Sequence, residues 1–290
     1  MLTPTEPKHY ISAELVGSLV VNVERRITIT LISCYAGNLP NYFPFWARSV
    51  AGNPSIRVLL IVDRVPAFSL PENCDYVIIP LAELAARVQR AASLDRPVAL
   101  HRGFKICDVR PLLGVALEDH LRGQEFWGWL DLDVVLGDLR RSLARFDLAR
   151  IDVLSTRERH TAGGLTLVRN ASRTNSLFRD SADLEQVLTD PRSFGFDECG
   201  VFSDRSIDGF TQCVRRAARH GKIRACFAEL MRTDGKAEHD HSYLWSGGTL
   251  TDMDSGAHVL MYHFKDKKAL STFAVGVTDG EHFVVDANGI

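Results

Sequence analysis

The segment that decides the fold is FWGWLDLDVVLGD, residues 126–138. Its first half is aromatic and apolar, which is typical of a strand buried on both faces. The strand then runs into two acids, Asp131 and Asp133. Because side chains at positions i and i+2 of a strand share a face, we expect the two carboxylates to converge. Two like charges at the edge of a core are unfavourable unless a cation lies between them, and oxygen ligands suit Mg²⁺ or Mn²⁺.

Upstream of this segment, buried strands alternate with amphipathic helices. We predict strands at 27–34, 57–63 and 74–81, and helices at 42–54 and 81–94. This alternation is the βαβ pattern of a doubly wound, mostly parallel sheet. Residues 1–24 form an extension ahead of the predicted core.

Downstream, the pattern becomes mixed. We predict a helix within 104–123 after Pro111, strands at 151–158, 164–170 and 258–264, and a helix at 210–226. A boundary near residue 150 would divide a nucleotide-sugar-binding half, 25–150, from an acceptor-binding half, 151–290, that ends in a metal and diphosphate segment. No linker composition marks that boundary, so we expect one continuous domain.

Composition excludes several classes of protein. Hydrophobic residues make up 46% and charged residues 24% of the chain, with a net charge of -2. These values are those of a globular protein, and they argue against nucleic-acid binding through a basic surface.

We see no apolar run long enough to span a bilayer and no signal peptide, so we expect a cytoplasmic protein, with docking at the inner face of the membrane left open. The sequence leaves the oligomeric state unknown.

The chain resembles the GT-A superfamily of glycosyltransferases, in which an Asp-x-Asp after a core strand binds a metal and a nucleotide-sugar diphosphate. It is most similar to a bacterial Asp-x-Asp group within that superfamily, across residues 27–265. The resemblance implies an α/β fold of GT-A (Rossmann-like) type, with a mixed, mostly parallel sheet flanked by helices. The segments that carry it are GNLPNYF (37–43), NP (53–54), Asp63, KICDVRP (105–111), FWGWLDLDVVLGD, RN (169–170) and YHF (262–264).

The resemblance also implies roles for residues far from the acid pair. His263 is similar to the start of a late motif in family-8 retaining glycosyltransferases, where a histidine completes the metal site and a lysine holds the diphosphate. The glycine of that motif is absent here. Lysines follow at 265, 267 and 268, and Lys268 has the closest spacing. An imidazole suits Mn²⁺, and a lysine would stabilise the leaving diphosphate.

Three residues before the acid pair are predicted to bind the donor. Lys105 and Asp108 share one face if their segment is helical. In similar GT-A enzymes an aspartate at this place binds hydroxyls of the donor sugar and a nearby basic residue contacts the phosphates. Arg110 is an alternative phosphate contact. A surface ion pair between Lys105 and Asp108 is the competing interpretation.

The strand ends supply the nucleotide side of the predicted site. Acids at the carboxyl ends of strands in open α/β sheets face the ligand crevice, which is where Asp63 lies. In GT-A enzymes this position touches the nucleobase or ribose. Ser33 and the residues that follow it to Gly37 would line the same pocket, and Tyr35 would stack on uracil or, alternatively, belong to the core.

GFDECG (195–200) places Asp197 and Glu198 between glycines, as in an active-site loop. One of the two carboxylates would act as the base that deprotonates an acceptor hydroxyl. The alternative is a pair of solvated loop acids. His160, beside Gly163 and Gly164, would border the acceptor. Asp138 is predicted to cap the helix that follows it rather than to join the site.

We therefore predict a metal-dependent glycosyltransferase that transfers a hexose from a UDP-sugar to a hydroxyl of a glycan or small molecule. Its cofactor would be Mn²⁺ or Mg²⁺. Two alternatives stay open: a phosphohydrolase of the haloacid-dehalogenase kind, whose first motif is also a strand ending in Asp-x-Asp, and a non-catalytic sugar-binding protein. At least three predicted strands precede the acid pair, which argues against the phosphohydrolase. Donor sugar, acceptor and stereochemical outcome are not determined by the sequence.

Overall fold

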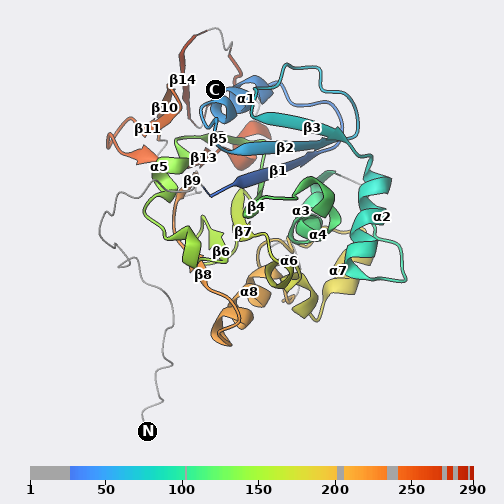
Figure 1. Ribbon diagram of the computed structural model, residues 1–290. Coiled ribbons are helices and arrows are strands. Elements are labelled where there is room, and N and C mark those ends of the chain that lie inside the picture. The colour runs from blue at the N-terminus through green and yellow to red at the C-terminus, as the bar shows by residue number, and fades with distance from the viewer. Residues whose placement is uncertain are drawn as a thin grey trace.

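A seven-stranded sheet runs through the centre of the molecule (Figure 1). The computed structural model describes residues 27–101, 103–200, 206–233, 241–269, 273–276, 280–286 and 288–290. The predicted extension, 1–24, lies outside the described residues. In spatial order the strands are β3 (Cys74–Ile78), β2 (Arg57–Val62), β1 (Ile29–Tyr35), β4 (Phe126–Leu130), β7 (Leu165–Arg169), β6 (Val153–Ser155) and β8 (Ala225–Phe227).

The sheet is mixed and mostly parallel. The pairs β3–β2, β2–β1, β1–β4 and β6–β8 are parallel, and only β7 runs antiparallel to its two neighbours, β4 and β6. This confirms the predicted fold class. It also brings strands from both sides of residue 150 into one sheet, so the described residues form a single continuous domain. The division of its functions at residue 150 stays a prediction.

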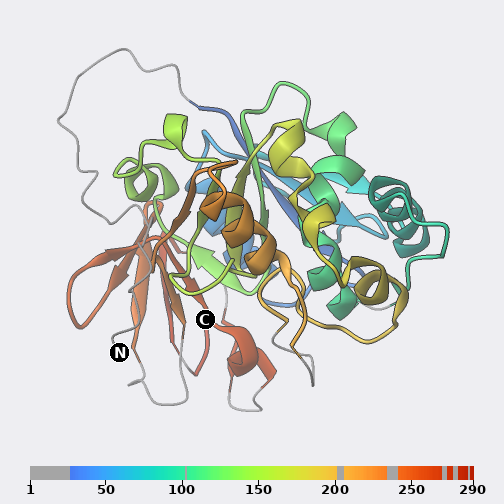
Figure 2. The ribbon, with the colours of Figure 1, turned by 90° about the horizontal axis from the view of Figure 1, so that it is seen from below.

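Helices cover both faces of the sheet (Figures 1 and 2). One face packs against the hydrophobic sides of α2, α3, α4, α7 and α8, and the other packs against α1 and α5. β1 shows why the strands are apolar throughout, because Ile32 points into one of these cores while Leu31 points into the other. The helices are α1 (Phe43–Ala51), α2 (Leu81–Ala92), α3 (Ile106–Val109), α4 (Leu113–Ala116), α5 (Leu139–Leu143), α6 (Ser172–Asn175), α7 (Leu184–Thr189) and α8 (Phe210–Arg219).

Two smaller sheets lie beside the large one, and most of their strands come from the C-terminal part of the chain (Figure 2). The three-stranded sheet has the order β5 (Val134–Leu136), β13 (Met261–His263), β9 (Met231–Thr233). The four-stranded sheet has the order β12 (His258–Val259), β11 (Thr249–Asp252), β10 (Tyr243–Ser246), β14 (His282–Val285). Because β13 pairs with β5, it brings residues near position 262 next to those that follow the acid pair.

The structure differs from the sequence prediction in four segments. Asp131 and Asp133 do not belong to a strand: β4 ends at Leu130, and the chain bends before β5 joins the second sheet. Residues 104–123 form short α-helical and 3₁₀ turns instead of one helix. The predicted helix at 210–226 ends at Arg219, with a left-handed Gly221 after it and strand β8 from Ala225. The predicted strand at 258–264 divides into β12 and β13.

The prediction for Asp138 is confirmed. Its side chain accepts a hydrogen bond of 2.9 Å from the backbone N–H of Arg141, which caps α5. Asp138 is therefore a capping residue in this structure.

Candidate active site

The acid pair and His263 form one cluster at the carboxyl end of β4. Ligand atoms of Asp131, Asp133 and His263 lie within 4.8 Å of one another. The Nε2 atom of His263 is 3.1 Å from the Oδ1 atom of Asp133 and 3.7 Å from the Oδ2 atom of Asp131. Asp133 and His263 are buried, with 8% and 5% of their surfaces exposed. Two carboxylates, one of them buried and the other half-buried, and a buried imidazole are a suitable donor set for Mn²⁺ or Mg²⁺.

The convergence of the two acids arises from the bend after β4 rather than from the pleat of a strand. The Asp131 N–H donates to the Gly164 carbonyl at 3.1 Å, and the Asp131 carbonyl accepts from the Trp46 indole at 3.0 Å. The Asp133 carbonyl accepts from the Phe264 N–H at 3.2 Å. Neighbouring backbone and α1 therefore hold both ends of the bend, and β13 supplies the histidine.

Two cationic side chains flank the acids. Arg110 is hydrogen-bonded to the carboxylate of Asp131, and Lys268 to that of Asp133. Arg110 also donates to Asp197 at 2.7 Å and to the Gly163 carbonyl at 2.9 Å. The Lys268 side chain is 38% exposed, so it can turn toward a ligand, whereas Arg110 is held from three sides. Lys268, one of the three candidate lysines, forms an ion pair with Asp133.

Three carboxylates, those of Asp131, Asp133 and Asp197, lie beside two cations, Arg110 and Lys268. Burial raises the pKa of Asp131 despite the opposing effect of Arg110, and it raises the pKa of Asp197 to about 8. Burial also acts to raise the pKa of Asp133, but His263 and Lys268 outweigh it and lower that pKa. A divalent cation among these carboxylates would favour their ionised forms, so the charge balance of the site fits a metal ion.

Asp197 and Glu198 come from a loop that reaches the cluster from the other side. Asp197 is 2% exposed and pairs with Arg110, while the Glu198 side chain is 18% exposed. The Glu198 Oε1 atom accepts from the Gly163 N–H at 3.0 Å and lies 3.8 Å from the Nε2 atom of His160. The two adjacent acids thus have different surroundings: one is buried against a guanidinium and the other is open to a ligand.

Gly163 and Gly164 are buried between these groups. A Cβ atom at Gly163 would lie 3.0 Å from the Glu198 Oε1 atom and 3.3 Å from both Arg110 and Asp197. One at Gly164 would lie 2.8 Å from the sulfur of Met231 and 3.1 Å from the Nδ1 atom of His263. Glycine at both positions therefore lets the backbone approach the cluster closely.

The residues predicted to contact the nucleotide lie at the ends of β1 and β2. Asp63 follows β2; it accepts from the Gly37 N–H at 3.0 Å and pairs with Arg64, and these bonds lower its pKa. Tyr35 ends β1 and is half-buried. Ser33 is fully buried, and its hydroxyl donates to the Leu130 carbonyl at 2.8 Å. The side chain of Ser33 therefore ties β1 to β4.

Lys105 and Asp108 lie in the interior rather than in this cluster. Lys105 is 2% exposed and Asp108 is fully buried, and their charged atoms are 2.8 Å apart. Their other hydrogen bonds go to backbone groups between Val187 and Phe196. A surface ion pair is therefore ruled out, and contact of either residue with a donor stays a prediction.

Sequence reasoning missed two residues of the site. Tyr42, at the start of α1, is close enough to the acids to be affected by their charge. Burial is the main cause that raises the pKa of its phenol, and the charge of Asp133 is the second. Trp46 lies one helical turn further and holds the Asp131 carbonyl. The segment GNLPNYF carries part of the resemblance, but nothing local to it indicates that α1 begins beside residues 131–133.

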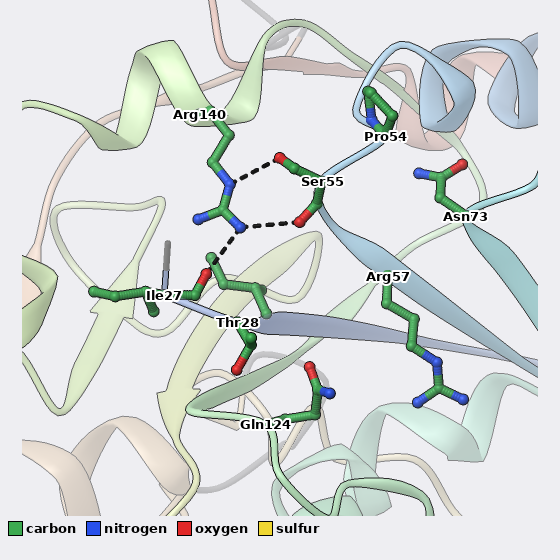
Figure 3. Close-up of a pocket in the computed structure, with 9 residues that line it drawn as sticks. Ile27, Thr28, Pro54, Ser55, Arg57, Asn73, Gln124 and Arg140 are labelled. Atoms are coloured by element: carbon green, nitrogen blue, oxygen red, sulfur yellow. Dashed lines mark hydrogen bonds between the residues drawn. The ribbon is translucent and has the colours of Figure 1, made fainter. Parts of the chain in front are cut away.

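Two other features lie outside the cluster. A cavity of about 300 Å³ opens at the amino ends of β1 and β2, the opposite end of the sheet from the acids; there Arg140 donates to Ser55 and to the Ile27 carbonyl (Figure 3). A second group of potential metal ligands consists of half-buried His241, buried Asp252 at the end of β11, and exposed Asp254. Within the described residues, no helix is long and apolar enough to cross a membrane.

Comparison with known proteins gives a family and several structural likenesses. The profile of a family described as "Family of unknown function (DUF6625)" matches residues 31–290. A search of curated sequences returned no significant match. Mouse xyloside xylosyltransferase 1, in its apo form, is similar in structure with a TM-score of 0.47 and 12% identity, covering 82% of this chain and 98% of the other.

Two further similar structures are glycosyltransferases. The galactosyltransferase LgtC, in complex with donor and acceptor sugar analogs, has a TM-score of 0.43 and 10% identity, covering 81% of this chain and 87% of the other. The apo-form glycosyltransferase GlyE of Streptococcus pneumoniae TIGR4 has a TM-score of 0.38 and 9% identity, covering 69% and 45%. At such low identities and TM-scores, these likenesses do not bear on activity, donor or acceptor.

Proposed function

The chain belongs to the family of unknown function DUF6625, and we propose that it is a metal-dependent glycosyltransferase that moves a hexose from a UDP-sugar to a hydroxyl of a glycan or small molecule. The observation that carries the proposal is the cluster of Asp131, Asp133 and His263, with a guanidinium and an ammonium group already paired with the two acids. A site that combines a divalent cation with mobile and fixed positive charges suits a diphosphate leaving group.

Asp131, Asp133 and His263 would hold Mn²⁺ or Mg²⁺. The metal would act as a Lewis acid on the diphosphate and so stabilise the negative charge of the leaving nucleotide. Lys268, which is partly exposed, would turn from Asp133 toward the same phosphates. Arg110 would remain between Asp131 and Asp197 and add fixed positive charge to the site.

The nucleotide would lie across the ends of β1 and β2. Tyr35 would stack on the uracil ring and Asp63 would accept a hydrogen bond from the base or ribose. Ser33 would act through the backbone, because its hydroxyl is bonded to β4. The acceptor would enter beside His160 and the two glycines, Gly163 and Gly164.

Glu198 is the acid that we assign to the attacking hydroxyl. Its carboxylate has part of its surface exposed and is oriented by the Gly163 N–H, whereas Asp197 is buried and bonded to Arg110. In an inverting reaction Glu198 would accept the proton of the acceptor hydroxyl. In a retaining reaction the departing phosphate oxygen can take that proton instead. We favour retention, since the His263-Phe264 segment is the closer motif match.

The acceptor classes that fit this proposal are a lipid-linked or capsular glycan and a small natural product. Transfer in the cytoplasm, at the inner face of the membrane for a lipid-linked acceptor, is part of the same proposal.

The proposal is tested by UDP release from a panel of UDP-hexoses, with Mn²⁺, with Mg²⁺ and with excess EDTA. We expect turnover of at least one donor that stops with EDTA and returns when Mn²⁺ is added. Proton NMR of the fresh product then gives the anomeric outcome. Full turnover in EDTA would exclude the metal-dependent reaction, and hydrolysis of p-nitrophenyl phosphate without action on any UDP-sugar would favour the phosphohydrolase.

Glu198→Gln separates the two stereochemical outcomes. A general base contributes about 10²–10⁴-fold in rate, so an inverting enzyme should lose about that factor in this variant. In a retaining enzyme the loss should be much smaller. An inverted product together with a collapsed rate would refute retention and make Glu198 the base.

A further inference from the structure

Lys105 and Asp108 form a buried ion pair whose other bonds go to α7 and to the loop that follows it. The Lys105 ammonium donates to Asp108 at 2.8 Å and to the carbonyls of Val187 and Arg192, each at 2.6 Å. It also lies 5.1 Å from the ring centre of Phe194. Both carboxylate oxygens of Asp108 accept hydrogen bonds from the backbone of that loop.

The bonds of Asp108 go to a short, specific stretch. Its oxygens accept from the Phe194 N–H at 3.0 and 3.2 Å and from the Phe196 N–H at 2.9 Å. Gly195 between them adopts a left-handed φ of 69°, so the chain turns around the carboxylate. The residue that follows this turn is Asp197, and Glu198 comes next.

Stability alone does not explain a pair of this kind. A buried ion pair is often no more stabilising than apolar residues of the same volume, because the desolvation of both charges offsets their attraction. Here the charges satisfy backbone groups at positions 192–196, in a described stretch after α7, 191–200, that contains no helix or strand. The pair therefore fixes a loop conformation that packing of apolar side chains would leave less defined.

The same stretch of chain that carries the pair also carries Arg110. Asp108 lies in α3, and Arg110 is the next residue but one. Asp108 thus fixes the loop at Phe196. Arg110 donates to the carboxylate of the adjacent Asp197 at 2.7 Å and also pairs with Asp131. One segment therefore connects residues 194–198, which we call the acid loop, to the acid pair.

We propose that Lys105 and Asp108 are positioning residues that hold the loop 194–198 so that Asp197 keeps Arg110 against Asp131 and Glu198 faces the acceptor. This proposal rests on the proposed transferase function for its kinetic consequence. It assigns both residues an action through the loop instead of contact with the donor sugar. A displacement of about 1 Å in such a group costs on the order of 10²-fold in rate.

The test uses the double variant Lys105→Met/Asp108→Leu, in which both charges are replaced together so that neither is left buried and unpaired. The single variant Asp108→Asn, which keeps the shape but loses the charge, accompanies it. Arg169→Met is the matched control. Arg169 also bonds an aspartate and several backbone carbonyls, but at the other end of the sheet, where β7 ends.

Two kinds of measurement are needed. Steady-state kinetics separates kcat from the KM for the donor and compares the donor preference of each variant. Amide hydrogen exchange reports on the Phe196 N–H and on the Gly163 N–H, which is bonded to Glu198, with amides of β1 as the reference for global stability.

We expect the double variant to lose about 100-fold in kcat with its KM for the donor within about 3-fold, because a misplaced Asp197 no longer holds Arg110 against Asp131, whether or not Glu198 acts as the base. The Phe196 and Gly163 amides should exchange at least about 10-fold faster, with β1 amides unchanged. Arg169→Met should leave kcat and both loop amides as in the wild type.

Three results would overturn the proposal. A kcat within a few-fold of the wild type would show that the pair does not position the acids. A changed donor preference with kcat retained would show that Asp108 touches the sugar. Unchanged exchange at Gly163 would show that the pair does not act on Glu198. If the wild type transfers no sugar, the transferase function fails, and the exchange of Gly163 still decides whether the pair positions the loop.

Discussion

Asp133→Asn should weaken metal binding strongly while the protein still folds. The substitution keeps the size of the side chain but removes the charge that faces His263 at 3.1 Å and pairs with Lys268. Hydrogen bonds to charged groups contribute ~1.5–3 kcal/mol. The Lys268 side chain is 38% exposed and can turn into solvent, so its share is reduced by screening. We therefore expect a loss of about 1–2 kcal/mol in the free energy of unfolding without metal.

The effect on the metal should be larger. Removing a residue that only hydrogen-bonds to a metal-coordinating side chain lowers metal affinity by about 10–100-fold. Loss of a charged coordinating side chain itself should therefore lower it by more than ~100-fold. The assay is titration calorimetry with Mn²⁺, together with urea unfolding with and without the ion. At 100 times its dissociation constant a ligand stabilises the folded state by ~2.7 kcal/mol, which the wild type should show and the variant should not.

Asp138→Asn is the matched control, since it makes the same chemical change in the same segment. Asparagine caps a helix about as well as aspartate, so stability and Mn²⁺ affinity should both stay as in the wild type. Equal Mn²⁺ affinity in Asp133→Asn and the wild type would refute the assignment of the metal site. An equal loss in both variants would show that the effect is one of general charge.

Three further predictions concern the neighbours of the acid pair. The pKa of Asp197 is raised to about 8 in the fold, so the folded state binds a proton that the unfolded state releases near pH 4. The free energy of unfolding of the wild type should therefore fall, relative to that of Asp197→Asn, by up to ~1.4 kcal/mol per pH unit between pH 5 and 7.5. The same pH dependence of the unfolding free energy in both proteins, measured with urea, would contradict this. Gly163→Ala should lower kcat by at least ~10-fold with little change in the circular dichroism spectrum, because the new methyl group would lie 3.3 Å from Arg110 and from Asp197 as well as 3.0 Å from Glu198; an unaltered kcat would mean that these side chains can move aside. Lys268→Met should leave stability nearly unchanged but weaken UDP binding in the presence of Mn²⁺ by about 10-fold in calorimetry, and undiminished UDP affinity would exclude the lysine from the phosphates.

The central strands could be predicted from the sequence because their signal is local. Residues 27–34, 57–63 and 126–130 are apolar on both faces, and only a sheet covered on both sides can bury such runs. The parallel order of β1, β2 and β4 followed from the helices between them. The capping role of Asp138 was also readable, since a cap depends on residues only a few positions away.

The acid pair shows where a local pattern gives the right cluster for an incomplete reason. A strand would have placed Asp131 and Asp133 on one face, but the chain leaves the sheet at Leu130 and a bend brings them together. That bend is held by Trp46, Gly164 and Phe264, which are distant in sequence. The resemblance indicated His263, and no periodicity in the chain could have done so.

Lys105 and Asp108 mark what only the tertiary structure decides. At spacing i and i+3 they are indistinguishable in sequence from a solvated ion pair on a helix, yet both are buried and bonded to the loop before Asp197. Whether a charged side chain points inward depends on which distant segment can satisfy its hydrogen bonds, and that is fixed when the whole chain closes. The sequence thus determined the strands, the caps and the acid pair through local contacts, whereas the link from Asp108 through Asp197 and Arg110 to Asp131 exists only because α3, the acid loop and the end of β4 meet in three dimensions.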